Sequence, residues 1–317
     1  MINKKINRKR ESSKNDTELA LEIKSIEYRK KLLTYIKKAN AGHTGGSLSC
    51  VDILNVLYNR ILKVSPDTFK SPNRDRYIQS KGHSVEALYV VLADCDFFPE
   101  SELETLCQYQ SNYVGHPTRK VNGIEQNTGA LGHGLSISAG IALAGKMDQA
   151  TYRVFTLLGD GELAEGANWE AFLTAAHYQL DNLTAIIDYN GLQITGKTTA
   201  VCRTDPLPEK FTAFGWSVRE VDGHNLPELT RALQAVPFEP GKPSVACSLP
   251  KPSRAKGFLS WKMISGGITP YPVTSNLHWQ CRRWIKNILN SPRPIIKPLA
   301  FNNKSKYRQS SALYHKF

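Results

Sequence analysis

Residues 153–158, Arg-Val-Phe-Thr-Leu-Leu, form a short apolar run that leads directly into Gly159-Asp160-Gly161-Glu162. This pattern predicts a buried strand that ends at the glycines, followed by a helix from about Ala164 to Gln179. A second apolar run, Leu183–Asp188, predicts the next strand, and Tyr189-Asn190-Gly191 closes it. Strands that alternate with helices of this length are typical of a parallel sheet covered by helices on both faces. The sequence therefore predicts an α/β fold.

The same alternation continues on both sides of this unit. Towards the C-terminus, the pattern predicts a strand, a helix and a strand at Trp216–Val221, Leu226–Leu233 and Pro243–Ser248. Towards the N-terminus, apolar residues at helical spacing predict helices over residues 18–39, Cys50–Leu62, Val85–Asp94, Glu102–Tyr109 and Leu135–Lys146. After Leu249 the periodicity is lost, which places a domain boundary near residue 250.

The residues that follow the two central strands carry oxygen ligands for a metal ion. Asp160 offers a carboxylate, Asn190 offers an amide oxygen, and a backbone carbonyl at about Leu192 adds another. Because ligand sites of open α/β sheets lie at the carboxyl ends of the strands, these groups are expected to lie together. Mg²⁺ prefers such oxygens and shares its coordination with substrate phosphates. A Gly-Asp-Gly sequence alone is usually only a turn, but its place between strand and helix, with Asn190 beyond, favours a bound metal diphosphate.

The charge of the chain is unevenly distributed. Its 317 residues carry 41 Lys and Arg against 28 Asp and Glu, a net charge of +13. Residues 251–317 contain 13 of the basic residues and no acidic one, so 28 basic residues balance the 28 acidic ones in residues 1–250. The basic balance is therefore no sign that the main domain binds nucleic acid, and nucleic acid is not an expected partner.

These patterns divide the chain into three parts: a basic, disordered tail at 1–17, a diphosphate-binding domain at 18–250, and a divergent basic tail at 251–317. The last part has three interpretations: a divergent or frame-shifted C-terminus, an arm that binds a partner subunit or another acidic surface, or a nucleic-acid-binding segment with interleaved aromatic residues. The apolar runs are too short to span a bilayer. The six cysteines form no C-x-x-C pair, which indicates reduced thiols and predicts a cytoplasmic protein without membrane association.

Several motifs in order along the chain resemble a known family. Gly159-Asp160-Gly161 with Asn190 at this spacing is similar to the thiamine-diphosphate motif. Four further segments resemble the N-terminal section of transketolase: Gly42-His43-Thr44-Gly45-Gly46-Ser47, Ser80-Lys81-Gly82-His83, Gly115-His116-Pro117 and Thr128-Gly129-Ala130-Leu131-Gly132-His133-Gly134. The likeness covers roughly residues 18–250, and five ordered motifs make chance similarity a poor explanation.

The resemblance implies a thiamine-diphosphate-binding fold that holds thiamine diphosphate and Mg²⁺. By this likeness, Asp160, Asn190 and the carbonyl of Leu192 would hold the metal. His83 would contact the diphosphate. The other cofactor-binding positions that it implies are Gly129, Leu131, Gly161, Glu162 and Asn190.

The resemblance also implies residues that meet the substrate. His43 and His116 match positions that face the sugar and handle its hydroxyl protons, as imidazoles can near neutral pH. Glu165 matches an acidic position that belongs to a carboxylate chain across the subunit interface. His133 stands where the family would be expected to have glutamine, and residues 248–258 match the usual sequence after the last strand only loosely.

The chain is too short to hold the second domain of the family, which binds the pyrimidine ring of the cofactor. We therefore expect a split enzyme, in which this chain and a separate C-terminal subunit form a hetero-oligomer. Together they would transfer a two-carbon ketol unit from a ketose phosphate to an aldose phosphate. The alternatives are another thiamine-diphosphate enzyme, similar to deoxyxylulose-phosphate synthase or to a 2-oxoacid dehydrogenase, and a degenerate, non-catalytic relative.

Overall fold

The structure is a computed structural model that describes residues 2–194 and 196–249. Within this part of the chain, five parallel strands form one sheet in the order β1-β2-β3-β7-β6. The strands are β1 (Arg76–Gln79), β2 (Val154–Gly159), β3 (Leu183–Asp188), β6 (Ser217–Asp222) and β7 (Ser244–Leu249). The predicted α/β fold with a parallel sheet is confirmed. The predicted tail at 251–317 lies outside the described residues.

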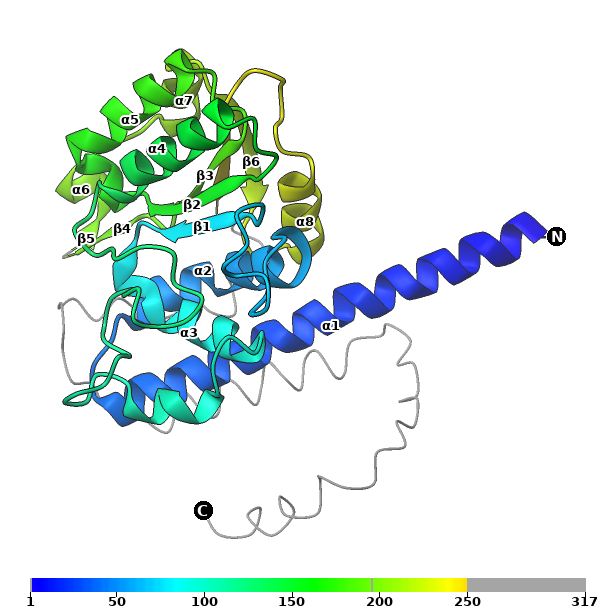
Figure 1. The fold of residues 1–317 in the computed structure, drawn as a ribbon, viewed down its shortest axis with the longest axis vertical. Helices are drawn as coiled ribbons and strands as arrows, with labels where there is room; N and C mark the ends of the chain where they lie inside the picture. Colours follow the sequence, from blue (N-terminus) through cyan, green and yellow to red (C-terminus); the bar gives the residue numbers. More distant parts are fainter. Residues whose placement is uncertain (1, 195, 250–317) are drawn as a thin grey trace, which may run out of the picture. The chain divides into compact units, whose positions relative to one another are not determined.

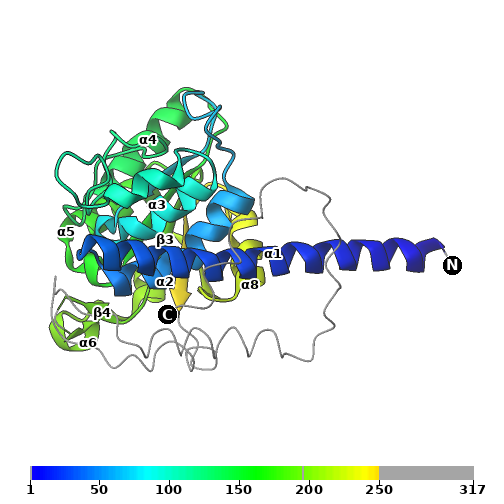
Figure 2. The ribbon, with the colours of Figure 1, turned by 90° about the horizontal axis from the view of Figure 1, so that it is seen from below.

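Helices cover both faces of the sheet (Figure 1). The helices are α1 (Ile2–Ala39), α2 (Thr44–Val56), α3 (Val85–Asp94), α4 (Gly134–Met147), α5 (Gly166–His177), α6 (Thr198–Val201), α7 (Leu207–Ala213) and α8 (Leu226–Gln234). Helices α4, α5 and α7 lie on one face, and α1, α2, α3 and α8 lie on the other; Figure 2 shows α1 and α2 side by side in front of β3. No helix in the described ranges is long and apolar enough to cross a membrane.

The core forms where the two central strands bury both of their faces. All six residues of β2 and all six of β3 are buried, as continuous apolar strands of a covered parallel sheet must be. On the α4–α5–α7 face, Phe172 packs on Phe211 and on Trp216, with ring centroids 4.7 and 4.8 Å apart. This packing fixes the strands, and so it fixes the loops at their carboxyl ends.

Strong apolar periodicity predicted the elements well. Helix α3 and strand β3 have the predicted bounds, and β2, β6, β7, α4, α5 and α8 lie within about two residues of theirs. The predicted helix at Cys50–Leu62 is α2, which begins earlier, followed by a π-helical turn at Leu57–Ile61. The predicted helix at Glu102–Tyr109 is a short 3₁₀ helix at Glu100–Thr105, because only Leu103 and Leu106 of the predicted segment are buried.

One expectation needs correction, and one strand and one hairpin were not predicted. Helix α1 begins at Ile2 rather than at residue 18, so the backbone of residues 2–17 is helical where a disordered tail was predicted. These residues are rich in Lys and Arg, which extend an existing helix readily without an apolar face. Strand β1 was missed because only Tyr77 and Ile78 mark it between turn residues. The hairpin of β4 (Leu192–Gln193) and β5 (Gly196–Lys197) was also missed, since each strand has two residues.

Close packing between two loops generates a test of this architecture. A Cβ on Gly82 would lie 2.7 Å from the backbone nitrogen of Gly129, and backbone atoms cannot easily move aside. Gly82→Ala should therefore lower the free energy of unfolding by about 2–3 kcal/mol in urea denaturation. The control is Gly140→Ala in α4, where a Cβ would meet nothing within 4 Å. It should stabilise the helix by about 0.5–1 kcal/mol; equal effects of both changes would contradict the packing.

Candidate functional site

The predicted metal ligands follow β2 and β3 at the carboxyl edge of the sheet. The backbone N–H of Gly191 donates to Oδ2 of Asp160 at 2.9 Å, and the N–H of Asp160 donates to the carbonyl of Asp188 at 3.2 Å. The carbonyl oxygen of Leu192 lies 3.2 Å from the place that a Cβ on Gly161 would take. The structure thus brings together Asp160, the Asn190–Gly191 turn and the Leu192 carbonyl, as the sequence predicted.

Asp160 has an unsatisfied charge. Its side chain is fully buried, and its Oδ1 atom has no hydrogen-bond partner in the described part of the chain. Burial, reinforced by the nearby charge of Asp188, raises the pKa of Asp160 from 3.8 to about 6, although the Gly191 N–H opposes this shift. An ionised carboxylate in such a place is costly unless a cation compensates it. The free oxygen therefore suits a bound metal ion.

Asn190 completes a set of oxygen donors suited to a hard cation. Its Oδ1 accepts the N–H of Leu192 at 2.9 Å, and its Nδ2 donates to Oγ of Ser49 at 3.4 Å. Carboxylate, amide and backbone carbonyl oxygens are ligands that Mg²⁺ prefers. Among the described residues, no group of three or more His, Cys, Asp or Glu side chains could hold a metal ion.

Three predicted histidines converge beside this edge. His43 precedes α2, His83 lies in a 3₁₀ turn at Gly82–Ser84, and His116 lies in the loop after α3. The His43 ring centroid is 5.5 Å from that of His83 and 6.1 Å from that of His116. Gly129, at φ +137°, lies against His116, where a Cβ would come within 2.6 Å of the ring. Residues from four separate motifs therefore form one cluster.

The histidine cluster is uncharged at neutral pH. Burial lowers the pKa of His43 and of His116 below the ordinary value of 6.5. Burial, together with the Lys81 charge, lowers the pKa of His83 to about 3. Neutral imidazoles can both accept and donate hydrogen bonds, which is what recognition of a polyhydroxy compound requires. The Nδ1 atom of His43 is buried without a partner among the residues described, so it is available to a ligand.

Three other predicted residues have different surroundings. Glu162 is buried, and its carboxylate accepts hydrogen bonds from Oγ of Ser80 at 2.5 Å, from Gly132 N–H at 3.0 Å and from Gly159 N–H at 3.1 Å. It therefore ties three loops together. Leu131 is half-buried in the Thr128–Gly134 loop. Glu165 is exposed at the start of α5, and within the described ranges its carboxylate accepts no hydrogen bond.

The sequence missed a buried ion pair beneath the site. Lys81 and Asp188 are almost completely buried, and the Lys81 ammonium group bonds to the Asp188 carboxylate. The same ammonium donates to the carbonyl of Gly46 at 3.1 Å. Lys81 stands inside the Ser-Lys-Gly-His motif, and Asp188 ends β3, so both belong to segments that the sequence marks. Their pairing depends on two loops meeting across the sheet edge, which no local pattern reveals.

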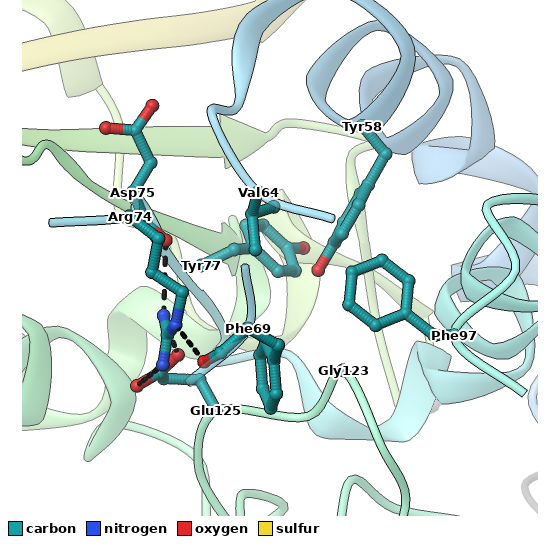
Figure 3. Close-up of a pocket in the computed structure, with 9 residues that line it drawn as sticks. All are labelled: Tyr58, Val64, Phe69, Arg74, Asp75, Tyr77, Phe97, Gly123 and Glu125. Carbon is teal, nitrogen blue, oxygen red and sulfur yellow. Dashed lines mark hydrogen bonds and ion pairs between the residues drawn. The ribbon is translucent and has the colours of Figure 1, made fainter. Parts of the chain in front are cut away.

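A small cavity of about 10 Å³ elsewhere in the chain is not part of this site. Figure 3 shows its aromatic lining, in which Phe69 packs under the Arg74 guanidinium at 4.5 Å from the ring centroid. Arg74 also forms an ion pair with Glu125 at 2.5 Å. The cavity has room for no more than about one water molecule, so it is a structural feature near the start of β1.

Comparison with known proteins identifies the fold. Residues 23–249 match the family described as "Transketolase, thiamine diphosphate binding domain". The chain belongs to the transketolase family. Among curated transketolases, it is 46% identical over 228 residues to a subunit of the apulose-4-phosphate transketolase of Phocaeicola vulgatus, a match that covers 72% of this chain and 81% of that protein. It is 38% identical over 252 residues to the SqwG subunit of the 6-deoxy-6-sulfo-D-fructose transketolase of Clostridium sp., covering 79% and 92%.

Longer transketolases match over part of their length. Human transketolase is 39% identical over 203 residues, which are 64% of this chain and 33% of that protein. The solved transketolase of Campylobacter jejuni aligns with a TM-score of 0.67 and 30% identity, over 72% of this chain and 37% of the other. That of Leishmania mexicana aligns with a TM-score of 0.67 and 27% identity, over 72% and 36%. The chain thus spans about a third of these longer transketolases.

The unsatisfied charge of Asp160 makes a prediction about stability. Because its folded pKa of about 6 exceeds the unfolded value, stability is lost as the pH rises from about 4 through 6 and the group ionises. Without metal or cofactor at pH 7.5, Asp160→Asn should raise the free energy of unfolding by about 1–2 kcal/mol. Urea denaturation at pH 7.5 and pH 4.5 measures this, and the gain should shrink at the lower pH. If Asp160→Asn is less stable than wild type at pH 7.5, other groups of the protein already compensate the charge of the carboxylate.

Proposed function

We propose that this chain is the thiamine-diphosphate- and Mg²⁺-binding subunit of a two-subunit transketolase. The assembled enzyme transfers a two-carbon ketol unit from a ketose phosphate to an aldose phosphate. The observation that carries the proposal is the buried, unpartnered oxygen of Asp160 beside the cluster of three neutral histidines in the described part of the chain. The diphosphate of the cofactor requires a bound cation, which the edge at Asp160 would hold. The sugar requires groups that bind hydroxyls, which the histidine cluster would supply.

The cofactor and metal would lie at the carboxyl edge of the sheet. Asp160, Asn190 and the carbonyl of Leu192 would hold Mg²⁺, which in turn neutralises the diphosphate. Gly161 supports this assignment, because a Cβ there would come within 2.9 Å of Gln193 in the β4–β5 hairpin. When bound, thiamine diphosphate supplies the carbanion chemistry and the electron sink for cleavage next to a ketone. The role of this chain is to bind and orient it.

The histidines would serve the sugar. His43 and His116 would accept or donate protons at its hydroxyl groups, and the buried Nδ1 of His43, which has no partner among the described residues, supports that role. Their lowered pKa values keep them in the neutral form that can act as a base near pH 7. His83 packs against Gly46 and would lie towards the diphosphate.

A partner protein would complete the active site. Two of the relatives are named as subunits of a transketolase, and the chain matches only a third of the longer transketolases. Next to the proposed ligand carbonyl, the β4–β5 hairpin and α6 expose the apolar side chains of Leu192, Ile194 and Val201, with Ile194 84% exposed. Adjacent exposed apolar residues commonly mark an interface. We propose that the pyrimidine-binding subunit covers them, near Glu165.

The names of two relatives indicate a general class of substrate. One is named for apulose-4-phosphate and another for 6-deoxy-6-sulfo-D-fructose, so both names describe anionic ketoses. We propose an anionic, phosphorylated ketose as the donor here. Catalytic competence is part of the proposal, since the ligand positions Asp160, Asn190 and His83 are present.

The central experiment combines binding with activity. Calorimetry should detect thiamine diphosphate binding only with Mg²⁺, and Asp160→Asn should weaken it at least about 100-fold. The exposed Asp148→Asn is the matched control and should bind normally. Mixed with the cognate C-terminal subunit, the chain should transfer a ketol unit from xylulose 5-phosphate, and alone it should not. Turnover of pyruvate instead would favour the deoxyxylulose-phosphate synthase or 2-oxoacid dehydrogenase alternatives, and cofactor binding without turnover would favour a non-catalytic relative.

The proposed interface has its own test. Ile194→Glu places a charge among the exposed apolar side chains. It should weaken association with the partner subunit by about tenfold or more, as measured by analytical ultracentrifugation. Met147→Glu is the control, because Met147 is also exposed but ends α4 at the opposite, amino edge of the sheet. Equal association of both variants and wild type would place the interface elsewhere.

A further inference from the structure

A buried carboxylate that the proposed function leaves unassigned lies beneath the histidine cluster. Glu86 stands in the first turn of α3 and is only 1% exposed. Its Oε1 accepts the backbone N–H of His43 at 3.2 Å, and its Oε2 accepts the hydroxyl of Ser47 at 2.7 Å. Burial raises the pKa of Glu86, while the bonds from Ser47 and His43 and the nearby His116 oppose that shift.

Residues 42–47, called the 42–47 loop here although they include the first turn of α2, are shaped to fit this carboxylate. Gly42 has φ +136°, and a Cβ there would lie 2.7 Å from Oε1 of Glu86. A side chain at this position would therefore be strained and would displace the carboxylate. At the other end of the loop, a Cβ on Gly46 would lie 3.0 Å from the His83 ring. The loop is thus held between Glu86 and His83.

Glu86 also supplies what the start of α2 lacks. His43 precedes the helix and gives no side-chain cap. In many helices the third residue is Glu or Gln, and its side chain bonds back to the N–H of the capping residue. Here that third residue is Gly46, which has no side chain, and Glu86 accepts the His43 N–H from a different helix. An anion is also favoured at the amino end of a helix.

We propose that Glu86 is a positioning residue, which fixes the His43 ring against His83 and His116 through its two hydrogen bonds to the 42–47 loop. Its effect on catalysis rests on the proposed function, because it requires His43 to meet the sugar. Glu86 itself acts only through the backbone of His43 and the side chain of Ser47. Its effect should therefore appear in turnover more than in cofactor binding.

Two substitutions separate hydrogen bonding from other roles. Glu86→Met fills a similar volume but accepts no hydrogen bond, so both donors lose their partner. Glu86→Gln can still accept the His43 N–H with its carbonyl oxygen and can donate its amide to the Ser47 oxygen. The matched control is Asp75→Leu. Asp75, drawn in Figure 3, is another buried carboxylate, and it accepts the backbone N–H groups of Lys63 at 3.0 Å and of Arg153 at 2.9 Å.

Hydrogen exchange of the full chain, followed by mass spectrometry, measures the positioning directly. In Glu86→Met, the amides of residues 43–47 should exchange about tenfold faster than in wild type. In Glu86→Gln, their exchange rates should stay within about threefold of wild type. In Asp75→Leu, these rates should not change. Should Glu86→Met fail to fold, Ser47→Ala removes one of the two bonds and should give an intermediate increase. Wild-type exchange in Glu86→Met or in Ser47→Ala, or equally fast exchange in Glu86→Met and Glu86→Gln, would overturn the proposal.

Activity of the assembled enzyme provides the second measurement. In Glu86→Met, kcat should fall about tenfold or more, while KM and the affinity for thiamine diphosphate change by no more than about twofold. Glu86→Gln should restore most of kcat. A parallel loss of kcat and cofactor affinity would overturn the proposal, since it would indicate a general collapse of the site. Faster exchange in Glu86→Met supports the positioning role even if the wild-type assembly transfers no ketol unit, a result that would instead refute the proposed function.

Discussion

The arrangement of the site depends on one buried carboxylate oxygen that has no hydrogen-bond partner in the described chain. Asp160 follows β2 at the carboxyl edge of the sheet, and one of its oxygens accepts the Gly191 N–H while the other has no partner in the described chain. Such an arrangement costs folding energy, and its persistence makes sense where a cation arrives with a ligand. The surrounding loops hold the carboxylate in this position by packing against one another. The sheet therefore positions the carboxylate, and a cation from outside the chain would compensate its charge.

Tight glycine contacts and buried acids hold the site in shape. Gly82 packs on the backbone of Gly129, which packs on His116, so three motif loops hold one another in place. Glu162 joins the loops at Ser80, Gly132 and Gly159, and Glu86 joins α3 to the start of α2. Each acid sits beneath the surface on which ligands would lie. The residues nearest the ligands are thus supported by a layer of acids that need not touch them.

Local patterns in the sequence predicted most of the fold and the positions of the ligand residues. Strand β3 and helix α3 were found because their apolar residues are continuous or periodic, and Asp160 and Asn190 were found because both follow such strands. Strand β1 escaped notice, since four residues with two apolar side chains carry little signal. The Lys81–Asp188 pair and the role of Glu86 depend on contacts between segments far apart in the chain. Glu162 was predicted at the cofactor, and its three hydrogen bonds, which the sequence did not reveal, show that it also ties loops together.

The Lys81–Asp188 pair has a consequence for the response of the site to ionic strength. Both side chains are nearly inaccessible to solvent, so dissolved salt ions cannot approach them closely enough to screen their attraction. The exposed Glu165 has no such protection, and the neutral histidines carry no charge for salt to screen. Rising salt should therefore leave this internal support of the site intact.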